Sequence, residues 1–181
     1  FRRVLFRSLK KITTVPIDVH LMVNHPEDII PMCLEAGADI ISFHPETANN
    51  KIFRLLNQIK DAGKKCGVVL NPATPAESIA EYAHLLDKVT VMSVDPGYAG
   101  QKFIPESLNK IRKLINMRKN NGYHYLTEID GSCNEKTFGQ IAESGVDVFI
   151  VGTSGLFSLH EDVSQAWDRM IEIFQRETVA A

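Results

Sequence analysis

Residues 125–134, Tyr-Leu-Thr-Glu-Ile-Asp-Gly-Ser-Cys-Asn, predict a short strand that ends in a tight turn. Asp130 stands where the strand ends, Gly131-Ser132 supply the turn, and Asn134 is placed to cap a following helix. Ligands bind at the carboxyl ends of strands in sheets that helices cover, so Asp130 is a candidate for chemistry. Asp-Gly is also a common turn dipeptide, and the stretch alone is equally consistent with a turn that has no chemical role.

The rest of the chain repeats this pattern of strand, turn and helix. Near-continuous apolar runs predict strands at residues 17–23, 39–44, 66–70, 88–94, 125–130 and 147–151. Helical patterns, several of them ended by glycine, follow at residues 26–36, 50–62, 75–84, 105–120, 134–144 and 160–176. Such alternation, with strands buried on both faces, is typical of an α/β parallel sheet that is either doubly wound or closed into a (β/α)₈ barrel.

The composition predicts one globular domain that binds a small molecule. Of the 181 residues, 44% are hydrophobic and 23% are charged, and the formal net charge is -2. We therefore expect no nucleic-acid partner and no membrane partner, because neither anionic surface would attract this chain. The three cysteines are far apart, no apolar run approaches a membrane span, and no secretory leader is apparent. These features predict a cytoplasmic protein.

Residues 1–8, Phe-Arg-Arg-Val-Leu-Phe-Arg-Ser, fit this organisation poorly. Three arginines alternate with apolar residues, and the segment has no capping or turn chemistry. It looks like the translation of a sequencing-adaptor tail, so we predict that residues 1–8 are an artefactual leader and that residues 9–181 form a single domain. The alternative is an ordinary basic turn of helix.

Polar residues and glycines follow the ends of the predicted strands: His20, His44, Asn71, Asp95, Asp130 and Gly152. An imidazole from His20 and a carboxylate from Asp130 are the mixed nitrogen and oxygen ligands that zinc, manganese or iron accepts. A lone histidine in an apolar strand is more often a hydrogen-bonded core residue. Two ligands also cannot hold a catalytic metal tightly, since three or four are usual.

Glycine-rich turns follow the last three predicted strands. They are Gly97-Tyr98-Ala99-Gly100, Gly131-Ser132 and Gly152-Thr153-Ser154-Gly155. Glycine allows backbone amides to surround an anion, and turns after the last strands of a barrel commonly bind phosphate. One such loop is weak evidence, but three in succession favour a substrate that carries a phosphate group.

Three segments resemble the ribulose-phosphate 3-epimerase family. They are Asp-Val-His-Leu-Met-Val at residues 18–23, Val-Asp-Pro-Gly-Tyr-Ala-Gly-Gln at residues 94–101, and Ile-Asp-Gly-Ser at residues 129–132. The resemblance extends from Leu9 to about Glu177.

Other positions resemble the hexose branch of this family, which acts on D-allulose 6-phosphate. They are Ala99, Ser132 and the run Gly-Thr-Ser-Gly-Leu-Phe at residues 152–157.

The resemblance implies a (β/α)₈ TIM barrel that interconverts D-allulose 6-phosphate and D-fructose 6-phosphate. A proton next to the ketone would be removed and returned through an enediolate, with one divalent cation (zinc, manganese, iron, cobalt or magnesium) as cofactor. Asp130 would be the catalytic acid/base and a metal ligand, and His20 a second metal ligand. The implied substrate-binding residues are His20, Met22, Gly97, Tyr98, Ala99, Gly100, Asp130, Gly131, Ser132, Gly152, Thr153 and Ser154. The full-length protein would be a homo-oligomer.

The sequence meets the family only after the family's first two β/α units. Those units supply a substrate-binding Ser, a second metal-binding His and a second catalytic Asp. Neither Asp18, which we interpret as structural, nor His25 replaces them by motif. We therefore expect an incomplete barrel with half a metal site and an open sheet edge, which leaves the activity of this chain by itself open.

Other functions stay open at this point. The first is a ribulose-5-phosphate 3-epimerase, which comparison of the two sugar phosphates would distinguish. A second is another phosphate-binding barrel, such as a decarboxylase or a barrel of the tryptophan pathway. A third is a non-catalytic phosphosugar-binding barrel, which would bind its ligand without any metal dependence.

Overall fold

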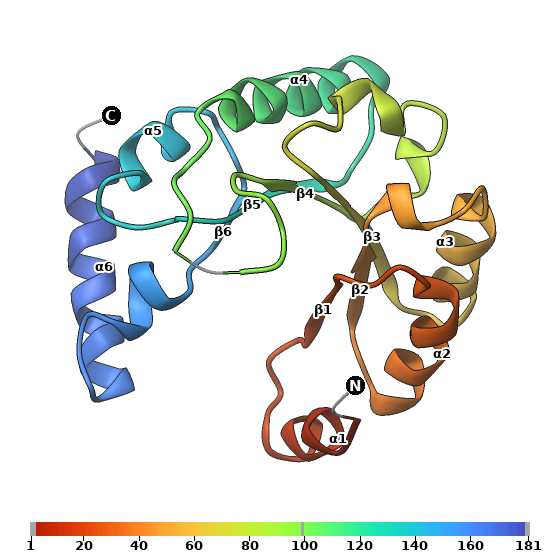
Figure 1. The fold of residues 1–181 in the computed structure, drawn as a ribbon, viewed down its shortest axis with the longest axis horizontal. Coiled ribbons are helices and arrows are strands. Elements are labelled where there is room, and N and C mark those ends of the chain that lie inside the picture. Colours follow the sequence, from red (N-terminus) through yellow and green to blue (C-terminus); the bar gives the residue numbers. More distant parts are fainter. Residues whose placement is uncertain (1–2, 99, 180–181) are drawn as a thin grey trace. The chain divides into compact units, whose positions relative to one another are not determined.

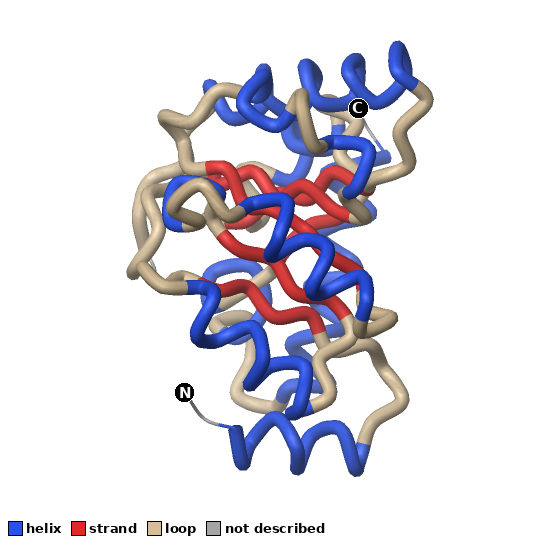
Figure 2. The backbone as a smooth tube through the Cα atoms, turned by 90° about the vertical axis from the view of Figure 1, so that its right-hand side faces the viewer, coloured by secondary structure: helices blue, strands red, loops and turns tan. Residues whose placement is uncertain are grey.

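The structure, a computed structural model, describes residues 3–98 and 100–179 (Figure 1). Strands and helical segments alternate along this part of the chain. Figure 2 shows the strands in red and the helices in blue. None of the helices in these ranges is both long and apolar enough to span a membrane.

All six predicted strands are present, and five of them are shorter than predicted because the apolar runs continue into the turns. The strands are β1 (Asp18–Leu21), β2 (Ile40–Phe43), β3 (Lys65–Leu70), β4 (Lys88–Met92), β5 (Leu126–Asp130) and β6 (Val148–Ile150). The α-helices are α1 (Arg3–Ile12), α2 (Pro26–Ala36), α3 (Ile52–Asp61), α4 (Glu106–Asn121), α5 (Phe138–Ala142) and α6 (Val163–Val179). Three 3-10 turns, η1 (Pro45–Thr47), η2 (Ala76–Ile79) and η3 (Ala83–Leu85), and one π-helical turn, η4 (Thr153–Phe157), complete the elements.

The strand order identifies the type of sheet. The strands form one six-stranded sheet in the order β1-β2-β3-β4-β5-β6, and the pairs β1–β2, β2–β3 and β5–β6 are parallel. A doubly wound sheet reverses its strand order at a switch point, whereas a (β/α)₈ barrel adds each new strand beside the previous one. The α/β class and the barrel-type strand order are thus confirmed. The complete barrel with two missing units stays a prediction.

The chain forms two compact units. The first comprises Phe1–Val69 with Ile79–Val89, and the second comprises Leu70–Ser78 with Thr90–Ala181. The boundary passes through β4. The prediction that residues 9–181 are one domain stays a prediction.

Helix α1 begins at Arg3, within the segment predicted to be an artefactual leader. Residues 1–2 of that segment lie outside the described residues. Near the end of α1, Lys10 Nζ lies 2.5 Å from Asp39 Oδ2, and this hydrogen bond is the main reason why the pKa of Asp39 is lowered. The artefactual origin of residues 1–8 stays a prediction.

Helix α2 begins and ends at the predicted residues. Pro26 occupies the first turn, where a missing N–H costs nothing. At the other end Gly37 adopts a φ of 90° and donates its N–H to the carbonyl of Leu34. Glycine accepts this left-handed conformation without steric cost, so the sequence fixes the end of this helix.

The predicted helix at residues 75–84 is wrong, because this segment forms η2 and η3 instead. Its hydrogen bonds reach back three residues, from the Tyr82 N–H to Ile79 and from the Leu85 N–H to Tyr82. The buried side chains, Ala76, Ile79, Tyr82 and Ala83, would suit an α-helix as well. The Ser78 hydroxyl donates to Pro75 O at 2.7 Å, so this side chain competes for a carbonyl that an α-helix would use.

The predicted helix at residues 134–144 is also wrong in its first turn, since α5 begins only at Phe138. Asn134 does not cap it. Its Oδ1 accepts the Lys136 N–H at 3.1 Å, while Thr137 Oγ1 accepts the Asn134 N–H at 3.0 Å and donates to Ser132 O at 2.7 Å. Asn and Thr side chains thus compete with the helix for backbone groups and hold this segment in a turn.

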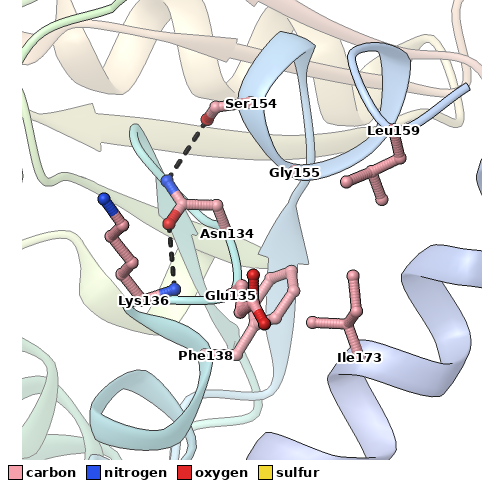
Figure 3. A pocket seen from close by; sticks show the side chains of 8 residues that line it. All are labelled: Asn134, Glu135, Lys136, Phe138, Ser154, Gly155, Leu159 and Ile173. Atoms are coloured by element: carbon pink, nitrogen blue, oxygen red, sulfur yellow. Dashed lines mark hydrogen bonds between the residues drawn. The ribbon is translucent and has the colours of Figure 1, made fainter.

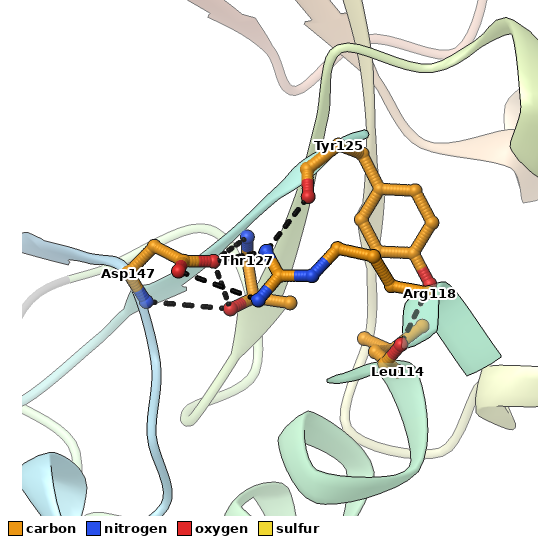
Figure 4. Close-up of polar contacts among 5 residues, drawn as sticks. All are labelled: Leu114, Arg118, Tyr125, Thr127 and Asp147. Atoms are coloured by element: carbon orange, nitrogen blue, oxygen red, sulfur yellow. Dashed lines mark hydrogen bonds and ion pairs between the residues drawn. The ribbon is translucent and has the colours of Figure 1, made fainter. Parts of the chain in front are cut away.

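A polar network anchors β5 in the second unit (Figure 4). Asp147 Oδ2 accepts hydrogen bonds from Arg118 Nη1 at 2.6 Å and from the backbone N–H and hydroxyl of Thr127, both at 2.8 Å. Burial opposes ionisation of Asp147, but these hydrogen bonds outweigh it and lower its pKa. The Tyr125 hydroxyl donates to Leu114 O at 2.7 Å, so α4 is tied to the start of the strand that carries Asp130.

Candidate functional site

Two histidines form a polar pair in the first unit. His20 lies on β1 opposite Ser42 of β2, and His44 directly follows β2. The Nε2 atoms of the two imidazoles are 2.8 Å apart, with ring centroids separated by 4.9 Å and planes inclined by 38°. His44 is buried, and this burial, with the nearby His20, lowers its pKa. The sequence placed both residues at strand ends but did not predict that they form a pair.

Asp130 ends β5 in the second unit, where its backbone is held by Ser93. The carbonyl oxygen of Asp130 accepts the Ser93 N–H at 2.8 Å, and the Ser93 hydroxyl lies within hydrogen-bonding distance of the carbonyls of Asp130 and Gly131. The carboxylate therefore projects from a fixed point at the strand end. It is half-buried.

The turn after Asp130 requires the residues that occupy it. Gly131 has a φ of +122°, and a Cβ there would lie 2.7 Å from Val94 Cγ2 and 2.9 Å from Ser93 Oγ. Only glycine combines this dihedral with this close approach. Ser132 follows with a φ of 49° and donates its hydroxyl to Gln101 O at 2.5 Å. The turn is thus joined to the loop that follows β4.

The described parts of all three predicted substrate loops come together in the second unit. Gln101 Nε2 donates to Tyr98 O at 3.0 Å and so closes the first loop, while Gln101 O accepts the Ser132 hydroxyl from the second. The third loop packs against the second so closely that a Cβ on Gly155 would lie 2.1 Å from Cys133 O. Asn134 Nδ2 also lies 3.3 Å from Ser154 Oγ.

A cavity of about 250 Å³ borders the third loop (Figure 3). The residues that line it are Asn134, Glu135, Lys136, Phe138, Ser154, Gly155, Leu159 and Ile173. In Figure 3 the Asn134 amide bridges Ser154 and the backbone of Lys136, while the apolar side chains of Leu159, which follows η4, and of Ile173 on α6 lie on the other side. The hollow therefore lies beside Ser154 and has one polar wall and one apolar wall.

The remaining predicted site residues are exposed or lie outside the described ranges. Met22, directly after β1, is 49% exposed, and Tyr98 is 72% exposed. Gly152 and Thr153 are exposed at the start of η4. Ala99 lies outside the described residues.

A metal site is incomplete within residues 3–98 and 100–179. There, no three His, Cys, Asp or Glu side chains are grouped so that they could hold a metal ion. His20 belongs to the first unit and Asp130 to the second. Their donor atoms suit a divalent cation, but three or four ligands are usual, so these residues alone do not constitute the site.

Residues that connect the loops were not predicted from the sequence. Ser93 and Asn134 each join two segments through one side chain, and the backbone carbonyl of Gln101 accepts the Ser132 hydroxyl. Gln101 was part of a motif, and Asn134 stood at a turn, yet neither pattern identifies the distant hydroxyl that contacts the Gln101 carbonyl or the Asn134 amide. Such partners depend on how neighbouring loops pack.

Comparison with solved structures supports the fold. Tryptophan synthase alpha-subunits from Pyrococcus furiosus superpose with a TM-score of 0.67 over 97% of this chain and 71% of that chain. Their sequence identity is only 13%, so the likeness concerns the fold alone.

Sequence comparison gives a closer relationship. Curated ribulose-phosphate 3-epimerases are 44% identical over 144 residues in Buchnera aphidicola, 42% over 161 in Aquifex aeolicus and 43% over 141 in Escherichia coli K12. These matches cover 80%, 89% and 78% of this chain, but 62%, 72% and 62% of the relatives' lengths. The model described as the ribulose-phosphate 3 epimerase family matches residues 1–157. The chain therefore belongs to the ribulose-phosphate 3-epimerase family.

Proposed function

We propose that this chain is part of an isomerase that inverts carbon 3 of a ketose phosphate, with D-ribulose 5-phosphate as the substrate. The curated relatives are named ribulose-phosphate 3-epimerases, which favours the pentose over the hexose phosphate. The structural observation that carries the proposal is the convergence of glycine-rich loops beside Asp130, through the contacts of Ser132 with Gln101 and of Gly155 with Cys133.

The reaction needs a proton to leave one face of the substrate and return to the other. A hydrogen next to a ketone is a weak acid, so a positioned acid/base group is required on each face. We assign one of these roles to Asp130, because Ser93 fixes its backbone at the strand end and its carboxylate is half-buried. The opposite group is not assigned to any residue of this chain.

The glycine-rich loops are proposed to bind the phosphate group. Gly97, Gly100 and Gly152 are exposed and have no atom within 4 Å of the position that a Cβ would take, so a ligand can approach their backbones closely. Backbone amides in such turns suit a phosphate, which needs several donors and no bulky neighbours. This assignment covers residues 97–100, 131–132 and 152–154.

We also propose one divalent cation as cofactor, of open identity, with His20 and Asp130 as candidate ligands by family resemblance. The described residues do not complete its site, so no catalytic step is assigned to the ion. The cation would be tested by metal analysis of the purified protein and by removal with a chelator. A homo-oligomeric state and a cytoplasmic location also stay predictions.

The activity is proposed for a protein that extends over the length of its relatives. The chain spans 62% of the Buchnera and E. coli proteins that it matches. We keep the prediction that two further β/α units complete the barrel, and the test is to compare this chain with a version that carries them. Metal binding and turnover that occur in the longer version and not in this chain would support the prediction.

The deciding experiment follows the C3 proton of the substrate. Purified protein is incubated in deuterated water with D-ribulose 5-phosphate, D-fructose 6-phosphate or D-allulose 6-phosphate, and deuterium at C3 is measured by mass spectrometry. We expect incorporation with the pentose phosphate and much less with either hexose phosphate. Preference for the hexoses would restore the allulose 6-phosphate assignment. Binding without exchange in both versions would instead indicate a non-catalytic phosphosugar-binding protein.

A further inference from the structure

We propose that His44 is a positioning residue for His20: its imidazole holds the His20 ring in one orientation and one tautomer. The inference rests on the proposed function, in which His20 is a candidate ligand of the divalent cation. It gives a role to a histidine that neither the family resemblance nor the sequence pattern assigned.

The strands bring the two side chains to the same face of the sheet. His20 pairs in register with Ser42, and His44 stands two residues beyond Ser42. Side chains alternate along an extended chain, so residues two apart share a face. His44 keeps an extended backbone, with φ of −77° and ψ of 121°, and the alternation therefore continues to it.

The separation of 2.8 Å between the two Nε2 atoms requires a hydrogen bond. Two bare lone pairs or two N–H groups would repel at this distance, so one ring must donate and the other must accept. Whichever ring donates, the position of the proton on each imidazole becomes fixed, because the hydrogen bond of one nitrogen sets the tautomer. The protonation of the other ring nitrogen of His20, Nδ1, would then be defined, as a ligand of a divalent cation requires.

His44 is the better anchored member of the pair. It is 4% exposed, whereas His20 is only half-buried. Its carbonyl accepts hydrogen bonds from the backbone N–H of Thr47 at 3.0 Å and from the Thr47 hydroxyl at 2.9 Å. Pro45 follows it and confines its backbone to the extended region. The ring of His44 is therefore a fixed support against which His20 can be held.

The second ring nitrogen of His44 argues for function rather than stability. Its Nδ1 is buried and has no hydrogen-bond partner among the described residues. A buried polar atom without a partner destabilises a fold, so an apolar ring of similar size would serve packing better. What histidine adds at this position is the hydrogen bond to His20.

Histidine NMR tests this inference directly on the 181-residue chain. With ¹⁵N-labelled histidine, we expect one tautomer at His20 and a ¹⁵N–¹⁵N scalar coupling across the hydrogen bond to His44. His44→Phe should abolish the coupling and give averaged tautomers at His20 without lowering the melting temperature. His84→Gln, at an exposed histidine of the same unit, is the matched control and should leave the His20 signals unchanged.

Turnover distinguishes positioning from packing. In whichever version of the protein exchanges the C3 proton, His44→Phe should lower kcat/KM about 10–100-fold. His44→Gln keeps a hydrogen-bonding group and should lose less. The opposite order, with Phe more active than Gln, would show a packing role and overturn the proposal.

The NMR experiment and the turnover experiment together distinguish failure of this inference from failure of the proposed function. If no version exchanges the proton, the proposed function fails, and the NMR experiment still decides the histidine pair. Averaged tautomers at His20 in the unmodified chain, or His20 signals unchanged by His44→Phe, would overturn the positioning role.

Discussion

Gly155 packs so closely on Cys133 that a Cβ at residue 155 would lie 2.1 Å from the Cys133 carbonyl oxygen. This contact joins the π-helical turn η4 to the turn that follows Asp130. Because the nearest atom belongs to the backbone, no side-chain rotation can relieve the collision. The close packing of the third glycine-rich loop on the second therefore requires glycine at residue 155.

Gly155→Ala is expected to lower the free energy of unfolding by about 1–3 kcal/mol, as overpacking does. Urea denaturation followed by circular dichroism would measure it. Gly152→Ala is the matched control, since that glycine has no atom within 4 Å of the added Cβ and no positive φ. Equal stability of the two variants would show that the loops are not packed in this way.

Asp147→Asn is expected to destabilise the fold by about 2 kcal/mol at neutral pH, because charged hydrogen bonds to Arg118 and Thr127 are lost. The folded protein holds the pKa of Asp147 below its ordinary value of 3.8. Its contribution is therefore complete above that value and is lost as the pH falls through the lower folded pKa.

Unfolding of the Asp147→Asn variant should accordingly depend less on pH below about 4 than unfolding of the unmodified chain. Asp168→Asn, at an exposed carboxylate on α6, provides the control. If the free energy of unfolding of the Asp147→Asn variant falls below about pH 4 as steeply as that of the unmodified chain, the assigned role of this network is contradicted.

The three thiols are expected to be unreactive while the chain is folded. Burial raises the pKa of Cys33 and Cys66 to about 11 and, with nearby Asp130, that of Cys133 to about 12. A thiol reagent reacts with the thiolate, so at about pH 8 little modification should occur without denaturant. All three should react in urea. Rapid labelling of the folded chain would show that one of these cysteines is accessible.

The elements that follow local chemistry could be predicted, and those that depend on distant partners could not. Pro26 and Gly37 define the ends of α2 within one segment, and the apolar runs locate every strand. The segment 75–84 carries an equally good helical pattern, but it forms two 3-10 turns, and the Ser78 hydroxyl bonds to Pro75 O in place of a helical N–H. In 134–144, Thr137 bonds to Ser132 and shortens the helix.

The same distinction applies to the candidate site. The sequence predicts His20 and Asp130 near strand ends, and the structure has His20 in β1 and Asp130 at the end of β5, whereas their role in binding stays a prediction. The pairing of His20 with His44 requires the register between β1 and β2, which no local pattern specifies. The hydrogen bond from the Ser132 hydroxyl to the Gln101 carbonyl, 31 positions earlier, likewise depends on how the two loops pack.

Asp130→Asn tests the proposed acid/base role of the Asp130 carboxylate. The amide is nearly isosteric but cannot accept or return a proton, so C3 exchange should fall about 10²–10⁴-fold. The substitution leaves in place the hydrogen bonds that the Ser93 N–H and hydroxyl donate to the backbone carbonyl of Asp130. The melting temperature should therefore change little, and Asp168→Asn should retain full exchange. If Asp130→Asn exchanges the proton at the unmodified rate, Asp130 binds or orients the substrate and another group carries the proton.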